Sequence, residues 1–182
     1  MVHDVIIETL EKDNNLPVNK SIQDESNHSL FEKEIRSTAV QPVKNRFVPG
    51  EVVAFSAMKV ANQQHIGLNQ NIIFEQVLTN EGDGYHPLHG VFIAPQSGLY
   101  VLSSAVLTFW GQEIHTAIIH NGNIIARIYG HGDNGRHDQG SQTVVLKLNV
   151  GDEVAVQNID YADTNIFGEV YSSFSGYLLS PQ

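Results

Sequence analysis

Cysteine is absent from the 182 residues, and its absence removes several kinds of chemistry at once. Without a thiol there is no disulfide framework, no cysteine nucleophile and no cysteine-bound zinc. The domain therefore has to be held together by packing alone. The compartment stays open, because secreted domains with a core of their own do not need disulfides.

Basic residues are also scarce: ten lysines and arginines stand against twenty acids, which gives a formal charge of −10. Such a chain repels a phosphate backbone, so no nucleic-acid partner is expected. No run approaches the roughly 20 apolar residues that span a bilayer, so membrane insertion is not expected either. The first ten residues carry acids where a secretory signal has basic residues. Either the chain is not secreted by that route or the sequence starts after processing.

Apolar residues are sparse in the first quarter of the chain, where Asn, Asp, Glu, Lys and Ser dominate. We therefore predict a polar extension over residues 1–49 and one domain over residues 50–182. Ser29 and Glu32 have the spacing of a capping box, which predicts a short helix over residues 30–36. The extension could be a stem for oligomers or a solvated tail, and the apolar residues are too few for a helix that is stable alone.

From residue 50 onward, apolar residues recur at every second position, as in strands that place one face against a core. The clearest run has Val144, Leu146 and Leu148 on one face. Similar runs occur over residues 53–57, 73–77, 99–109, 114–119, 124–129, 154–156 and 167–179. Asn121-Gly122 is the strongest hairpin signal between them, and no helical period separates the runs. The pattern predicts an all-β antiparallel sandwich or jelly roll.

Several motifs in this region have the spacing of a family signature: Phe74, Asn80, Tyr85, Phe92, Gly98 and Tyr100. Together with the runs at 53–57, 148–154 and 174–179, they make residues 51–182 resemble the globular domain of complement C1q. The family usually has two further aromatic residues where this chain has Leu102 and Ser104. The resemblance implies a ten-stranded jelly-roll sandwich of the C1q and tumour necrosis factor type. Its first and last strands lie side by side, and three subunits pack around a three-fold axis.

The residues offer a partial physical reason for a homotrimer. Residues 144–150 are apolar on both faces, as expected if one face meets the core and the other meets a partner. A sandwich that covers both faces internally would give the same pattern.

The loop after residues 124–129 is the best candidate for a ligand site, because its glycines expose it and its polar side chains can bond hydroxyls or a carboxylate. The candidate residues are His131, Asp133, Asn134, Arg136, His137 and Asp138. An ordinary turn would fit them equally well. Trp110, the one tryptophan, could stack on a sugar or belong to the core or its rim.

Nine histidines raise the question of a metal ion, for which Asp83, His86, His89 and Asp138 are the candidate ligands. Neither a helical His-x-x-x-His pair nor the His-x-His of cupin-type enzymes is present. Some relatives bind calcium through acids, but the matching positions here hold His86, Gly130 and His131. Calcium is therefore a disfavoured cofactor, and no other is predicted.

No nucleophile elbow, phosphate-binding glycine loop or paired carboxylates can be recognised, so no enzyme activity is predicted. The resemblance implies a secreted recognition protein of innate immunity that binds glycans or microbial surface patterns through the loops of a homotrimer. If the chain is secreted, Asn19 and Asn27 begin Asn-x-Ser glycosylation triplets. Two alternatives stay open: a cation-binding matrix or body-fluid protein that uses acids and histidines, and a cytokine-like trimer of the tumour necrosis factor fold.

Overall fold

The computed structural model describes residues 52–182. The predicted extension, its helix at residues 30–36 and the triplets at Asn19 and Asn27 lie outside the described residues. Within the described part, all regular structure is β, and it contains no helix that could cross a membrane. The strands are β1 (Ala54–Met58), β2 (Gln63–Ile66), β3 (Gln76–Glu81), β4 (Tyr85–His86), β5 (Val91–Ile93), β6 (Gly98–Leu107), β7 (Glu113–His120), β8 (Asn123–His131), β9 (Gln139–Leu148), β10 (Glu153–Asn158), β11 (Thr164–Ile166) and β12 (Ser173–Pro181).

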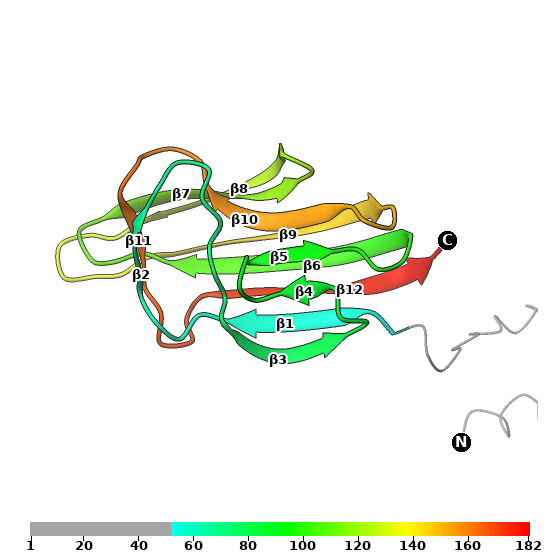
Figure 1. Ribbon diagram of the computed structural model, residues 1–182. Coiled ribbons are helices and arrows are strands. Elements are labelled where there is room, and N and C mark those ends of the chain that lie inside the picture. Colours follow the sequence, from blue (N-terminus) through cyan, green and yellow to red (C-terminus); the bar gives the residue numbers. More distant parts are fainter. Residues whose placement is uncertain (1–51) are drawn as a thin grey trace, which may run out of the picture. The chain divides into compact units, whose positions relative to one another are not determined.

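Ten of these strands form two five-stranded antiparallel sheets that pack face to face (Figure 1). The first sheet has the order β3-β1-β12-β6-β9, and the second has the order β4-β5-β10-β7-β8. The first and last strands are neighbours, with Ala54 opposite Tyr177. These findings confirm the predicted all-β sandwich of ten strands. A further ribbon of β2 and β11, which the sequence pattern did not indicate, lies across one end of the sandwich (Figure 1).

The core is aromatic and joins both sheets. Phe55 of β1 stacks on Tyr85 of β4 and Phe92 of β5, with ring centroids 5.1 Å and 4.7 Å apart. Phe174 of β12 meets the Phe55 ring edge-on at 4.8 Å. Tyr100 of β6 completes this row by packing against Phe92. The aromatic residues of the predicted signature are thus buried in one contiguous cluster.

The polar groups of two signature residues, Asn80 and Tyr85, hold the turn between β3 and β4 in place. The Asn80 side chain accepts the Tyr85 amide through Oδ1 at 2.9 Å and donates to the Tyr85 carbonyl through Nδ2 at 3.0 Å. The Tyr85 hydroxyl donates to the Phe74 carbonyl at 3.0 Å, so no buried hydroxyl is left without a partner there. Burial raises the pKa of Tyr85 to about 12, which keeps this donor protonated.

Leu102 and Ser104, which replace the usual aromatic pair, are both buried. Ser104 Oγ donates to the carbonyl of Ser173 at 2.9 Å, which ties β6 to β12. Gly176 lies opposite Leu102, and a Cβ there would come within 2.7 Å of the Leu102 side chain and 2.9 Å of the Phe55 ring. Glycine is therefore required at position 176, because it leaves room for both the Phe55 ring and the Leu102 side chain.

The strand predicted over residues 73–77 begins only at Gln76, because a buried lysine holds the preceding residues in a loop. Lys59 Nζ donates to the Ile73 carbonyl at 2.7 Å and lies 3.3 Å from Glu75 Oε2. Glu75 Oε1 in turn accepts the amide of Val60 at 2.9 Å. Burial lowers the pKa of Lys59, while its interactions with Glu75 oppose that shift. Phe74 still reaches the core from this loop.

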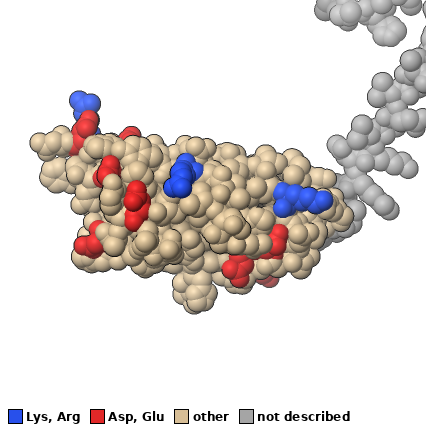
Figure 2. Space-filling view, turned by 90° about the horizontal axis from the view of Figure 1, so that it is seen from above, with Lys and Arg blue, Asp and Glu red and all other residues tan. Residues whose placement is uncertain are grey.

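The middle of the outer face of the first sheet carries no charged side chains. The three adjacent strands β1, β12 and β6 contain no charged residue. Val101 lies opposite Tyr177 on one side and Val145 on the other, and these three outward side chains form one row across the sheet. By contrast, the side of the molecule that Figure 2 shows, seen from above Figure 1, carries both basic and acidic side chains along its length.

Candidate ligand-binding surface

The hairpin of β7 and β8 positions the polar side chains on the outer face of the second sheet. Asn121 and Gly122 have φ values of 48° and 80°, which is the left-handed backbone of a tight hairpin turn. The hairpin predicted from this Asn-Gly pair is therefore present. A bulge between Ile118 and Ile119 then shifts the pairing of the two strands by one residue.

The shifted register decides which side chains meet. Glu113 lies opposite His131, and His115 lies opposite Tyr129. All four point outward, because the alternating neighbours Ile114 and Ile128 fill the core. Two residues of the loop after β10 join them. We call the six residues the β7–β8 patch: Glu113, His115, Tyr129, His131, Asp160 and Tyr161.

The Glu113 carboxylate is the centre of the patch. Its Oε2 accepts the Tyr129 hydroxyl at 3.2 Å and lies 3.5 Å from His131 Nδ1 and 4.0 Å from His115 Nε2. The Tyr129 hydroxyl and His131 Nδ1 are 2.9 Å apart, so these two side chains also share a hydrogen bond. One carboxylate thus accepts a hydrogen bond from a phenol and lies within ion-pair distance of two imidazoles.

His115 connects the strands to the loop after β10. Its Nδ1 lies 3.7 Å from Asp160 Oδ2, and its ring centroid lies 4.7 Å from Tyr129 and 5.6 Å from Tyr161. The two tyrosines remain about half exposed, at 50% and 54%. The patch therefore presents two aromatic rings to solvent on either side of an imidazole.

Partial desolvation and the nearby acids raise the pKa of both phenols. Partial desolvation, followed by the hydrogen bond and charge of Glu113, raises the pKa of Tyr129 above its ordinary value. The negative charges of Glu113 and Asp160 raise the pKa of Tyr161 in the same direction. The patch contains no lysine or arginine, so the acids also make it unfavourable for an anionic ligand. Its chemistry suits a ligand with hydroxyl donors and an apolar face.

Two residues of the predicted loop from Tyr129 to Asp138 hold the loop itself in place. His137 Nδ1 lies 2.6 Å from the Thr108 carbonyl, and its ring packs 4.6 Å from Phe167. Asp138 Oδ2 accepts the His131 amide at 2.8 Å. These two contacts give His137 and Asp138 a structural use. His131 is the predicted site residue whose side chain turns into the β7–β8 patch.

The remaining loop candidates lie at an exposed turn. The Asp133 carbonyl accepts the amides of Arg136 at 3.0 Å and of Gly111 at 2.9 Å. The second bond joins this turn to the turn that holds Trp110, which is 59% exposed. Asp133, Asn134 and Arg136 are all exposed. They stay predicted ligand residues, next to a solvent-facing tryptophan.

The predicted metal ligands are spread over the two edges of the second sheet. His86 ends β4 at one edge, and the turn after it returns through His89 to Gly90. Asp83 stands in the tight turn before β4 with a φ of 53°. Asp138 follows β8 at the opposite edge. Among residues 52–182, no three His, Asp or Glu side chains are arranged to hold a metal ion.

Sequence reasoning missed Glu113, His115, Asp160 and Tyr161. Glu113 and His115 alternate with buried residues of β7. This pattern indicates that their side chains point outward, but it does not indicate that they belong to a binding site. Asp160 and Tyr161 belong to a loop whose position the sequence does not reveal. Only the three-dimensional pairing brings the four residues beside Tyr129.

A model of the C1q domain family matches residues 54–179, which includes every strand of the two sheets except the last residues of β12. The chain belongs to the C1q domain family. Complement C1q tumor necrosis factor-related protein 3 of Mus musculus is 34% identical over 114 residues, which are 61% of this chain and 45% of that protein. Protein 7 of the same series from Mus musculus is 34% identical over 111 residues, which are 59% and 38% of the two lengths. The chain thus matches less than half the length of these relatives.

Solved structures show the same C1q and tumour necrosis factor jelly roll. The globular domain of zebrafish complement 1qA aligns with a TM-score of 0.60 and 16% identity, covering 71% of this chain and 99% of that one. Murine APRIL aligns with a TM-score of 0.57 and 13% identity, over 71% and 100% of the two chains. Eiger TNF from S. frugiperda aligns with a TM-score of 0.57 and 12% identity, over 70% and 91%. These likenesses confirm the predicted jelly-roll fold.

Proposed function

We propose that this C1q domain protein is a secreted, non-catalytic recognition protein that binds glycans of microbial or host surfaces as a homotrimer. The observation that carries the proposal is the β7–β8 patch. In this patch Tyr129 and Tyr161 are half exposed, and the Glu113 carboxylate accepts the Tyr129 hydroxyl. Exposed aromatic rings pack against the C–H faces of sugar rings, and carboxylates accept their hydroxyls. The role in innate immunity follows from the family resemblance.

The outer face of the first sheet supports assembly from copies of the same chain. C1q and tumour necrosis factor-like domains form trimers. In this chain the row of Tyr177, Val101 and Val145 lies on a face whose three middle strands carry no charge. Tyr177 and Val145 are 49% and 56% exposed in the single chain. An apolar row of this kind is stabilised when it is covered by a partner, and three equivalent copies can cover one another around an axis.

Assembly also strengthens weak sugar binding. A single shallow site on a surface holds one sugar weakly, whereas three identical sites on one rigid particle engage several ligands together. The first sheet then serves assembly while the second sheet remains open to solvent.

A glycan array tests the proposal with the full chain, in the presence and absence of a chelator. We expect sugar binding that survives the chelator and is weakened by Tyr129→Ala and Glu113→Gln. Glu81→Gln is the matched control, because Glu81 is an exposed acid on β3 of the other sheet. Binding that the two patch variants leave unchanged would place the site elsewhere, and the predicted loop residues Asp133, Asn134 and Arg136 would be the next candidates.

A receptor-binding cytokine is the second candidate function. It is favoured by the TM-scores of 0.57 to murine APRIL and Eiger TNF, which are close to the 0.60 of the C1q globular domain. An array that shows neither sugar binding nor metal uptake would favour this second function. The cation-binding alternative would instead show metal uptake without sugar binding, and it has no preformed ligand group in residues 52–182 to support it.

A further inference from the structure

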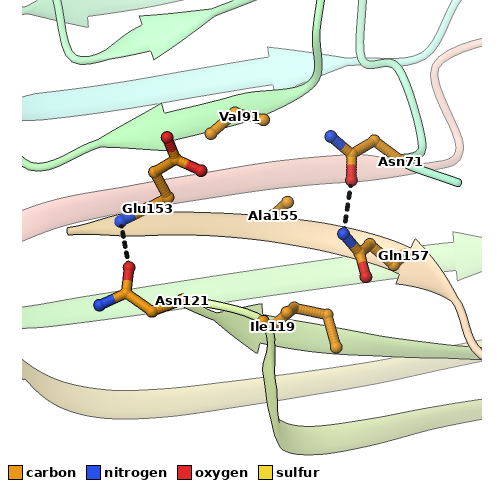
Figure 3. A pocket seen from close by; sticks show the side chains of 8 residues that line it. Asn71, Val91, Ile119, Asn121, Glu153, Ala155 and Gln157 are labelled. Carbon is orange, nitrogen blue, oxygen red and sulfur yellow. Dashed lines mark hydrogen bonds between the residues drawn. The ribbon is translucent and has the colours of Figure 1, made fainter. Parts of the chain in front are cut away.

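A pocket lies farther along the outer face of the second sheet, away from the β7–β8 patch (Figure 3). It has about 270 Å³ of free space, its open mouth included. Its lining comes from β5, β7, β10, the Asn-Gly turn and the segment before β3. The lining residues are Asn71, Val91, Ile119, Asn121, Gly122, Glu153, Ala155 and Gln157.

The floor of the pocket is apolar, and it has a shallow depression because one of its three side chains is very small. Val91 of β5, Ala155 of β10 and Ile119 of β7 lie side by side across three paired strands. Ala155 stands in the middle of the row, between two larger neighbours. This leaves a shallow depression over its methyl group, large enough for a small apolar group of a ligand.

The rim of the pocket is made of amides that the protein holds in place. Gln157 Nε2 donates to Asn71 Oδ1 at 2.9 Å, and Asn71 Nδ2 donates to the His89 carbonyl at 2.9 Å. Asn121 Oδ1 accepts the Glu153 amide at 2.9 Å, as Figure 3 shows. Gln157 Nε2 and Asn71 Nδ2 each use one of their two protons in these bonds, and Asn121 Nδ2 uses one on Asp152 Oδ1 at 2.9 Å. Each of the three NH₂ groups therefore keeps a second N–H that a ligand can accept.

Acceptors stand beside these donors. Glu153 is exposed and extends its carboxylate from the rim near Val91, and Gln157 contributes its Oε1 (Figure 3). The pocket therefore combines a methyl-sized apolar floor with amide donors and with a carboxylate acceptor. A secondary amide that ends in a methyl group has the complementary parts: an N–H, a C=O and an apolar end.

We propose that this pocket binds the acetamido group of an N-acetylhexosamine. The methyl group packs over Ala155, the amide N–H donates to the Glu153 carboxylate or Gln157 Oε1, and the carbonyl accepts a rim amide. The inference deepens the proposed glycan binding and rests on it. It also narrows the ligand class, because the carboxylate of Glu153 disfavours a sugar acid at the same place.

The test is calorimetric titration of the full chain with two probes, the β-1,4-linked tetramer of N-acetylglucosamine and the corresponding tetramer of glucose, which has a hydroxyl in place of each acetamido group. We expect the acetylated tetramer to bind at least tenfold more tightly. We expect Ala155→Leu, whose larger side chain fills the depression, to remove most of that difference. Glu153→Gln should weaken the acetylated tetramer several-fold, because the charged acceptor is lost. Glu81→Gln is again the control and should change neither probe.

The outcomes separate this inference from the proposed function. If other glycans bind but the two tetramers bind equally, or if Ala155→Leu and Glu153→Gln leave the difference intact, the acetamido site is wrong and glycan binding at the patch stands. If no glycan binds at all, both are wrong. Should Ala155→Leu fail to fold, Glu153→Gln and the comparison of the two probes still decide the question.

Discussion

The two outer faces of this sandwich are built from different kinds of residue. The middle of the first sheet offers serine, alanine, valine and a tyrosine without any charge, whereas the second sheet carries acids, histidines, tyrosines and a polar pocket. Both faces cover the same aromatic core. The contrast supports the two proposed roles, in which the uncharged face packs against copies of the chain and the polar face binds the ligand.

A charge placed on the first face should have the largest effect. In the proposed trimer, Val101→Asp would bury an unpaired carboxylate at three equivalent positions, so we expect the assembly to dissociate and the mass from light scattering to fall to one third. Arg127→Asp is the control, because Arg127 is an exposed residue of β8 in the second sheet, and it should leave the mass unchanged. A wild-type mass equal to one chain would contradict the assembly.

A change in the shared core should damage both faces together. Phe55→Ala removes the ring that stacks on Tyr85 and Phe92 and meets Phe174 edge-on. We expect a loss of about 3–5 kcal/mol in the free energy of unfolding, measured by urea denaturation, with assembly and sugar binding weakened in parallel. Phe55→Leu keeps part of the volume and should cost less. If Phe55→Ala weakened only assembly or only sugar binding, the two faces would not depend on a single core.

A change in the patch should affect the second face alone. We expect Tyr129→Ala to lower the affinity for bound glycans about tenfold, which corresponds to about 1.4 kcal/mol, because one aromatic surface and one hydroxyl are lost. The mass and the melting temperature should stay close to those of the wild type, since Tyr129 is half exposed. A lower melting temperature with normal binding would assign Tyr129 to structure instead.

The smallest effect is expected at the turn between β9 and β10, where Asp152 binds the Asn121 side chain of the β7–β8 hairpin. Asp152 accepts the Asn149 amide and Asn121 Nδ2, each at 2.9 Å, and these bonds hold the pKa of its carboxyl below its ordinary value of 3.8. A carboxyl with a lowered pKa stabilises the fold at pH values above 3.8, and this stability is lost as the pH falls through the folded-state value. Asp152→Ala should cost about 1 kcal/mol at neutral pH and flatten the acid dependence, whereas Glu81→Ala should do neither. Identical acid melting curves for Asp152→Ala and the wild type would rule this out.

Local patterns predicted the core but not the site. Phe74, Tyr85, Phe92 and Tyr100 are recognisable because burial at fixed strand positions demands large apolar side chains. The loop at residues 73–75 was predicted as a strand, since a period-two pattern cannot show that a buried lysine from another segment binds its backbone. The ribbon of β2 and β11 is too short for any period to be seen.

The site depends on a register that the sequence does not contain. A two-residue Asn-Gly turn without irregularity would place His115 opposite Ile128 and leave Tyr129 displaced by one residue. The bulge at Ile118 and Ile119 moves His115 opposite Tyr129 and Glu113 opposite His131. Bulges arise from backbone pairing and not from a residue type, so neither the patch nor the pocket beyond it could be assembled from sequence alone.

The pairing of β1 with β12 has a practical consequence for engineering. Because Ala54 lies opposite Tyr177 on neighbouring antiparallel strands, the start of β1 and the end of β12 meet at the same end of the sandwich (Figure 1). A short linker could join them, and new ends could be opened at the exposed Asn121-Gly122 turn. Such a circular permutant would keep both sheets while moving the ends of the chain beside the pocket, where a reporter group could sense an arriving ligand.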